Sequence, residues 1–125
     1  MKIIVIIARV LLGLVFVVFG LNAFFQFLPQ PPLPSGPAGD FLKALFVSHY
    51  VYAVGALQVV GGAILLTGRF VPLGLMLLGP VIVNILLFHS LLDHTGLPIA
   101  IVVAVLALIV LWHYRAPFAG LLKAK

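Results

Sequence analysis

Four apolar stretches run along the chain, over residues 3–28, 48–67, 70–89 and 97–113. A helix needs about 20 mostly apolar residues to cross the hydrocarbon core of a bilayer. Most charged residues lie between these stretches or at the chain ends. The pattern therefore predicts an all-α integral membrane protein, a bundle of four transmembrane helices that forms a single domain over residues 1–125.

The segment between the first two stretches has a different composition. Residues 29–37 include five prolines, and proline removes a backbone donor and fixes φ. We therefore predict a stiff, non-helical loop here. Asp40 is expected to cap a short interfacial helical turn over residues 41–46 that leads into the second span.

Other positions predict helix ends and packing. Gly68 is expected to end the second helix, and Thr95 to cap the fourth. Pro80 lies in the middle of the third span and predicts a kink. Small residues allow helices to approach closely in lipid; they recur at Gly13, Gly20, Gly55, Gly61, Gly62, Gly74, Gly79, Ala100 and Ala104.

Composition supports the membrane assignment and excludes several functions. Hydrophobic residues make up 65% of the chain and charged residues 7%, against about 25% charged in soluble domains. The chain has no cysteine, which excludes thiolate catalysis and iron–sulfur clusters that it ligates itself. The first stretch exceeds the roughly 7–15 apolar residues of a signal peptide, so we expect it to remain as a helix.

Basic residues predict the orientation in the membrane. In the four-span topology one side collects Lys2, Arg9, Arg69, Arg115, Lys123 and Lys125, whereas the other side has Lys43. The positive-inside rule then places both termini in the cytoplasm of a bacterial cell, with the proline-rich loop outside the inner membrane. Arg9 is expected to extend toward the headgroups. The basic residues form no patch with interleaved aromatics, so nucleic acid is not an expected partner.

Several segments together resemble the DoxX family of small four-helix bacterial membrane proteins. They are ARVLLG at 8–13, FGLN at 19–22, QVVGGAILLTGR at 58–69, PVIVNILLFH at 80–89 and YRAPF at 114–118. The resemblance implies the four-helix fold. It also implies a redox association, because the family includes relatives of a thiosulfate:quinone oxidoreductase subunit. Gln58 stands where many members have a glutamate; if that carboxylate handles protons in relatives, this chain lacks the group.

Amide side chains are the main polar groups inside the predicted spans, at Asn22, Gln26, Gln58 and Asn84. A polar group in hydrocarbon is costly unless it is hydrogen-bonded, so each is expected to face the bundle. One interpretation is hydrogen bonding between helices. The other is a pocket for a quinone or a lipid headgroup, formed by Asn84, Gln58 and His89.

Histidines gather on the predicted outer side. His49 begins the second span, His89 ends the third, and His94 follows. Imidazoles at one level can ligate haem iron or another metal, with Asp93 supporting a ligand. The alternative is that these are interfacial histidines with ordinary hydrogen bonds.

No pattern predicts an enzyme that acts alone. Ser48 and Ser90 adjoin His49 and His89, but neighbouring residues on a helix point in different directions. We expect a non-catalytic accessory subunit of a larger respiratory or photosynthetic complex of the inner membrane, with other membrane-protein subunits as partners. The alternative is a quinone- or haem-binding subunit of a membrane oxidoreductase. The nearly uncharged spans give little to line a transport pathway.

Overall fold

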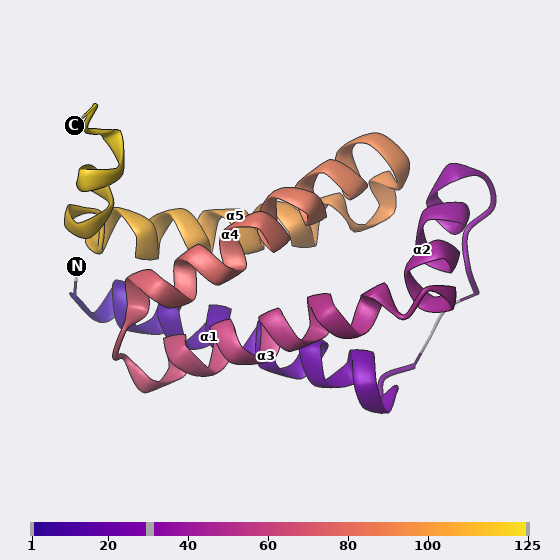
Figure 1. Cartoon of the computed structure of the whole chain (residues 1–125), viewed down its shortest axis with the longest axis horizontal. Coiled ribbons are helices and arrows are strands. Elements are labelled where there is room, and N and C mark those ends of the chain that lie inside the picture. The colour runs from indigo at the N-terminus through magenta and orange to yellow at the C-terminus, as the bar shows by residue number, and fades with distance from the viewer. Residues whose placement is uncertain (1, 30–31, 125) are drawn as a thin grey trace.

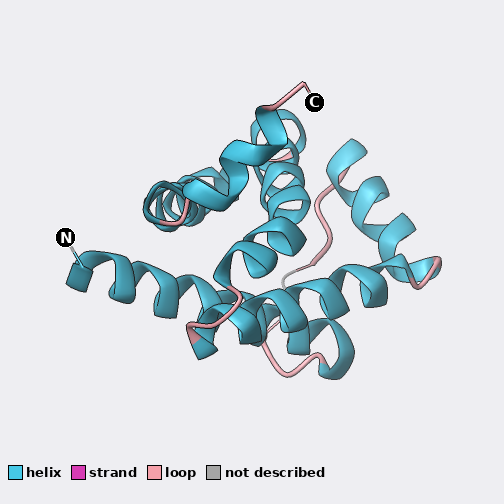
Figure 2. Ribbon diagram, turned by 60° about the vertical axis from the view of Figure 1, so that its left-hand side comes forward, coloured by secondary structure: helices cyan, strands magenta, loops and turns pink. Residues whose placement is uncertain are grey.

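The computed structural model describes residues 2–29 and 32–124, and it forms helices without any strand in those residues. Four helices are long and apolar enough to cross a membrane, so the prediction of an all-α membrane protein is confirmed. They are α1 (Lys2–Phe25), α3 (Tyr50–Thr67), α4 (Val71–Leu87) with its π-helical continuation η1 (Phe88–Leu92), and α5 (Leu97–His113), preceded by the 3-10 turn η2 (His94–Gly96). Short turns connect α3 to α4 and η1 to η2, whereas the longer segment 26–49 separates α1 from α3 (Figure 2).

The four spanning helices form a ring in which each contacts two others. α1 packs against α3 and α5, and α4 packs against the same two helices. The short helix α2 (Pro37–Val47) lies at one end of the bundle, against α3 and η1. The start of α1 and the C-terminal 3-10 helix η3 (Ala116–Leu122) lie at the opposite end (Figure 1). This arrangement agrees with an even number of crossings.

The buried core draws side chains from all four spanning helices. Its members include Leu12 and Phe16 of α1, Leu65 of α3, Leu78 of α4 and Val110 of α5, each at most 2% exposed. Most other large apolar side chains are exposed on the outside. A bundle with apolar residues both inside and outside is suited to lipid rather than water.

Glycines let α1 and α3 meet backbone to backbone. A Cβ on Gly13 would lie 2.9 Å from the Gly62 carbonyl oxygen, and one on Gly62 would lie 2.8 Å from that of Gly13. Gly20 and Gly55 repeat the arrangement: a Cβ on Gly20 would lie 2.8 Å from the Gly55 carbonyl oxygen, and one on Gly55 would lie 3.1 Å from that of Gly20. The two pairs are seven residues apart on each helix, so they fix the antiparallel register of α1 and α3.

A charged group completes the contact between these two helices. The guanidinium of Arg9 donates hydrogen bonds to the carbonyl oxygens of Leu65 and Leu66 at the end of α3. A cation there complements the negative end of the helix dipole. The side chain of Arg9 therefore caps α3, and its extension toward the headgroups stays a prediction. Gly68 ends α3 as predicted, with φ 72°.

Several helix ends differ from the sequence interpretation. α1 ends at Phe25 rather than near 28, because Gln26 takes a φ of 50°. α3 begins at Tyr50 and α4 at Val71, because His49 and Phe70 also have positive φ values, 64° and 57°. Left-handed conformations of non-glycine residues are uncommon, so sequence patterns do not reveal them.

Both predicted N-caps are wrong. α2 begins at Pro37 after Gly36, whose φ is 76°, and Asp40 lies in the first turn instead of capping it. The loop predicted over 29–37 is non-helical at residues 29 and 32–36, but Pro37 already belongs to α2; Gln30 and Pro31 lie outside the described residues. Gly96, not Thr95, is the N-cap residue of α5.

The glycine contacts make a direct prediction. Gly62→Ala should lower the free energy of unfolding by about 1–3 kcal/mol, because its Cβ would meet the backbone of α1. Gly79→Ala is the matched control in α4, since a Cβ there meets no atom within 4 Å. It should be neutral or stabilise by up to about 1 kcal/mol. Unfolding in detergent micelles measures both, and equal changes would contradict the packing argument.

Candidate functional site

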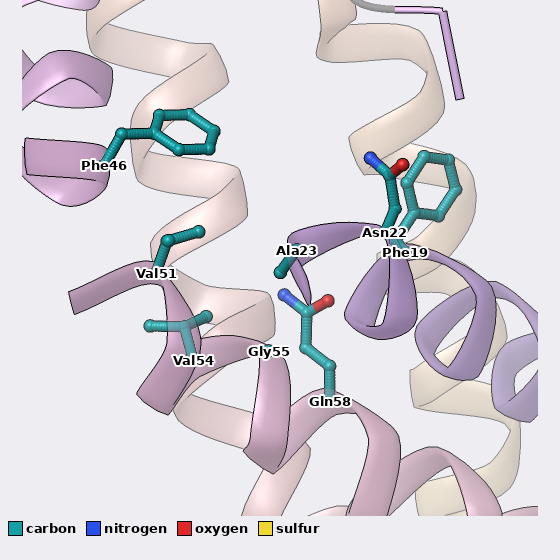
Figure 3. A pocket seen from close by; sticks show the side chains of 8 residues that line it. All are labelled: Phe19, Asn22, Ala23, Phe46, Val51, Val54, Gly55 and Gln58. Atoms are coloured by element: carbon teal, nitrogen blue, oxygen red, sulfur yellow. The ribbon is translucent and has the colours of Figure 1, made fainter. Parts of the chain in front are cut away.

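Two adjoining cavities lie between the helices, toward the end of the bundle that carries α2. The first, of about 190 Å³, is lined by Phe19, Asn22, Ala23, Phe46, Val51, Val54, Gly55 and Gln58 (Figure 3). The second, of about 250 Å³, is lined by Val15, Phe16, Phe19, Gln58, Ile85, His89, Ile99, Ala100 and Val103. Phe19 and Gln58 line both cavities, so these two residues form the boundary between them.

Gln58 supplies an amide to each cavity. It lies on α3, one turn after Gly55, and its side chain rises toward Ala23 of α1 (Figure 3). No hydrogen bond within the described part of the chain involves this amide, and that part holds no buried side-chain nitrogen or oxygen without a partner. The amide of half-buried Gln58 therefore opens on the cavities, where it can donate and accept.

Asn22 has a structural task beside the first cavity. Its Oδ1 accepts a hydrogen bond from the backbone N–H of Leu28 at 2.9 Å. This bond ties the chain after α1 back to its last turn, where Gln26 leaves the helical conformation. The Asn22 amide therefore holds the exit from α1 while it lines the cavity.

His89 lines the second cavity from the π-helical segment η1. The Asp93 N–H donates to the Phe88 carbonyl at 3.0 Å, a bond between residues five apart that defines a π turn. Such turns occur frequently at functional sites. The extra residue in the turn changes the direction in which the following side chains point, and it lets the chain reverse before α5.

Three contacts fix the orientation of the His89 ring. Nδ1 lies 3.1 Å from the backbone carbonyl oxygen of Asp93. A carbonyl only accepts, so Nδ1 carries the proton, and in the neutral ring Nε2 keeps its lone pair. Phe88 packs edge-on at 5.1 Å between centroids. The ring also lies against Gly96, where a Cβ would come within 2.6 Å of Nδ1.

Asp93 organises the turn beside His89. Its carboxylate accepts from the Thr95 hydroxyl at 2.6 Å and from the Thr95 N–H at 3.1 Å. These two bonds lower the pKa of Asp93 below its ordinary value; partial desolvation opposes them, and the charges of His89 and His94 add the smallest lowering contributions. The carboxylate therefore stabilises the fold above its unfolded pKa, and this is lost as pH falls through the lower folded pKa.

The residues predicted for a quinone or lipid pocket are only partly together. Gln58 and His89 line the same cavity, but Asn84 is exposed on the outside of α4. Its Nδ2 donates to the Pro80 carbonyl at 2.8 Å. The expectation that every amide faces the bundle is wrong for Asn84, and also for Gln26, which is exposed after α1.

The predicted metal ligands His49, His89 and His94 do not gather into one cluster. Among residues 2–29 and 32–124, no group of three or more His, Cys, Asp or Glu side chains is placed to hold a metal ion. His49 is exposed and stacks on Tyr52 at 5.7 Å, and His94 is exposed in η2. The histidines are separated because they lie in different connections between helices; His49 lies in the link between α2 and α3.

The cavities offer groups that can bind a ligand. They combine apolar walls with one free amide and one imidazole that has a fixed acceptor nitrogen. Drug-sized ligand sites measure about 300–1,000 Å³, so each cavity is suited to a head group. Sequence reasoning missed the part played by Gly96, whose only signal was its place before a predicted helix.

The contact between Gly96 and His89 can be tested directly. Gly96→Ala should displace the imidazole and break its bond to the Asp93 carbonyl, because the new Cβ needs the space that the ring occupies. The ¹⁵N chemical shifts of His89 should change from one fixed tautomer to a mixture. Gly120→Ala, where a Cβ meets no atom within 4 Å, is the control. Unchanged shifts in Gly96→Ala would show that the ring is not held this way.

Comparison with protein families identifies the family of the chain. The DoxX profile matches residues 4–90, from the first turn of α1 to the π turn that holds His89. α5 and the segment YRAPF at 114–118 lie beyond the match. Comparison with curated proteins and with solved structures finds no match. Since the profile covers more than half of the sequence, this chain belongs to the DoxX family of membrane proteins.

Proposed function

We propose that the protein is a non-catalytic accessory subunit of a larger complex in the bacterial inner membrane. The observation that carries the proposal is the use made of polar side chains in the spans. Arg9 caps α3, and Asn22 holds the exit from α1. These side chains form hydrogen bonds with backbone groups, and a side chain that is used in this way is not free to handle protons or substrate.

The outer surface also supports a subunit role. Side chains such as Ile7, Val102 and Leu108 are between 53% and 62% exposed, which gives the bundle an apolar exterior. Such a surface can be covered by lipid or by the helices of neighbouring subunits. The proposed environment is therefore the bilayer together with other membrane proteins.

The proposed orientation has both termini in the cytoplasm. It rests on the excess of Lys and Arg at one end of the four-span topology, and the start of α1 and η3 share an end of the bundle (Figure 1). The chain has no cysteine, so Lys123→Cys and Leu33→Cys give clean labelling sites. In intact spheroplasts a membrane-impermeant maleimide should label the second and not the first, and the reverse pattern would refute the orientation.

Gentle solubilisation tests the subunit role. The full chain, tagged and expressed in its native membrane, should bring down one or more membrane proteins in fixed ratio, because a subunit keeps its partners in mild detergent. Quantitative mass spectrometry measures the ratio, and an unrelated four-helix protein with the same tag is the control. Recovery of the chain without any enriched membrane protein, in several mild detergents, would contradict the proposal.

A second candidate function is the binding of a quinone head group, favoured by the cavity that joins Gln58 to His89. A quinone carbonyl can accept from the Gln58 amide, and a quinol hydroxyl can donate to Nε2 of His89. Haem fits less well, because the cavity measures about 250 Å³ and its lining includes one imidazole. In this function the chain would be a binding subunit, and a partner would carry the electrons.

Quinone binding has its own test. Gln58→Leu should weaken binding of a short-chain quinone about fivefold, the effect of losing one neutral hydrogen bond of about 1 kcal/mol. Titration of the purified protein in micelles measures the dissociation constant. Gln26→Leu is the matched control, because Gln26 lines neither cavity. Equal affinities in the two variants would exclude the Gln58 site, and the subunit proposal would remain.

A further inference from the structure

Asn84 is a polar group on the lipid-facing side of the bundle. It lies thirteen residues after Val71 and eight before Leu92, the ends of the third span. At about 1.5 Å per residue it is about 12 Å from the nearer end, well within a hydrocarbon core about 30 Å thick. Its side chain is nevertheless exposed.

The fold satisfies only part of this amide. Nδ2 donates one hydrogen bond, to the Pro80 carbonyl at 2.8 Å within the same helix. The second N–H and Oδ1 have no partner among the described residues. Lipid tails offer neither donor nor acceptor, so the remaining donor and acceptor call for a partner outside the chain.

The surface around Asn84 is suited to a close helix contact. Leu73, Met76, Val83 and Leu87 are each between 50% and 55% exposed, and Pro80 is exposed between them. These positions follow one another at intervals of three and four residues, the spacing of a helix-packing seam. Beside the seam Gly79 has open space where a side chain would be.

The outer face of α5 provides a contrast within the same molecule. Between Ile99 and Trp112 its exposed residues are all large and apolar, as at Val102, Val105 and Leu108. Such a face has no polar group that requires a hydrogen-bond partner, so lipid tails alone can cover it. The exposed amide and the open glycine therefore distinguish the outer face of α4 from that of α5.

We propose that the outer face of α4 binds the same face of a second copy of this chain, with the two Asn84 side chains hydrogen-bonded across a two-fold axis. A primary amide is self-complementary, because the free N–H of each can donate to the oxygen of the other. A two-fold contact uses one surface twice and closes as a dimer. This inference goes beyond the subunit role and needs no other protein.

Disulfide trapping in proteoliposomes tests the dimer. The chain has no cysteine, so Val83→Cys places a single thiol on the seam and Val105→Cys places one on α5, with 55% and 48% exposure. A disulfide requires Cα atoms within about 7 Å. With an oxidant and a large excess of lipid, Val83→Cys should give the covalent dimer and Val105→Cys little of it.

Substitution of Asn84 in the Val83→Cys background separates the amide from mere proximity. Asn84→Leu should lower the dimer fraction roughly threefold or more, because an outward leucine is compatible with lipid but makes no interhelical hydrogen bond. Asn84→Gln retains an amide and should keep most of the dimer. Circular dichroism checks that each variant is folded, and the two cysteine positions decide the question even if Asn84→Leu does not fold.

Three results would overturn the proposal. They are equal trapping at positions 83 and 105, an unchanged dimer fraction in folded Asn84→Leu, or trapping of position 83 in native membranes only to a different protein. Because the proteoliposomes contain this chain alone, their result is independent of the search for larger complexes. If the dimer forms in proteoliposomes but gentle solubilisation recovers no enriched membrane protein, this inference stands and the subunit role is refuted.

Discussion

The close approach of α1 and α3 determines the rest of the structure. Two reciprocal glycine pairs, Gly13 with Gly62 and Gly20 with Gly55, leave no room for side chains between the helices. This contact sets the register in which Arg9 reaches the last carbonyls of α3. Since lipid gives helices no hydrophobic reason to associate, such backbone contact is the main source of attraction available to them.

The candidate site lies beside this close contact. Phe19 directly precedes Gly20, and Gln58 lies between Gly55 and Gly62, so both larger side chains flank the glycine contact, and the cavities open around them. Glycines where the two backbones touch and larger side chains at neighbouring positions thus create space without disrupting the bundle. The site is a consequence of packing, and its polar groups are the few that packing leaves free.

Much of the fold could be predicted because lipid imposes a simple constraint. Four apolar stretches had to be helices, and Gly68 had to end one of them, since hydrocarbon allows no unpaired backbone. The exact ends were not predictable, because Gln26, His49 and Phe70 adopt positive φ values without being glycine. Sequence patterns describe one helix at a time, whereas those turns depend on how the helices meet.

The candidate site was predictable only in its chemistry. Gln58 was singled out as an amide inside a span and His89 as the residue that ends the third span, and the structure places both on one cavity. Asn84 was expected beside them, yet it points outward. Residue type shows that a polar group needs a partner. The direction in which the group points depends on how each helix is rotated about its axis. A helix with apolar residues on every face does not specify that rotation.

α4 and its π turn carry two polar groups with opposite tasks. Asn84 and His89 are five residues apart, and five residues turn an ideal α-helix through about 500°, which leaves them about 140° apart around its axis. One therefore faces lipid while the other faces the cavity. The π turn begins after Asn84 and includes His89, so it affects the imidazole and leaves the amide in regular helix. The proposed contact on the outside of α4 and the proposed ligand on the inside thus use separate groups of α4 and its continuation η1.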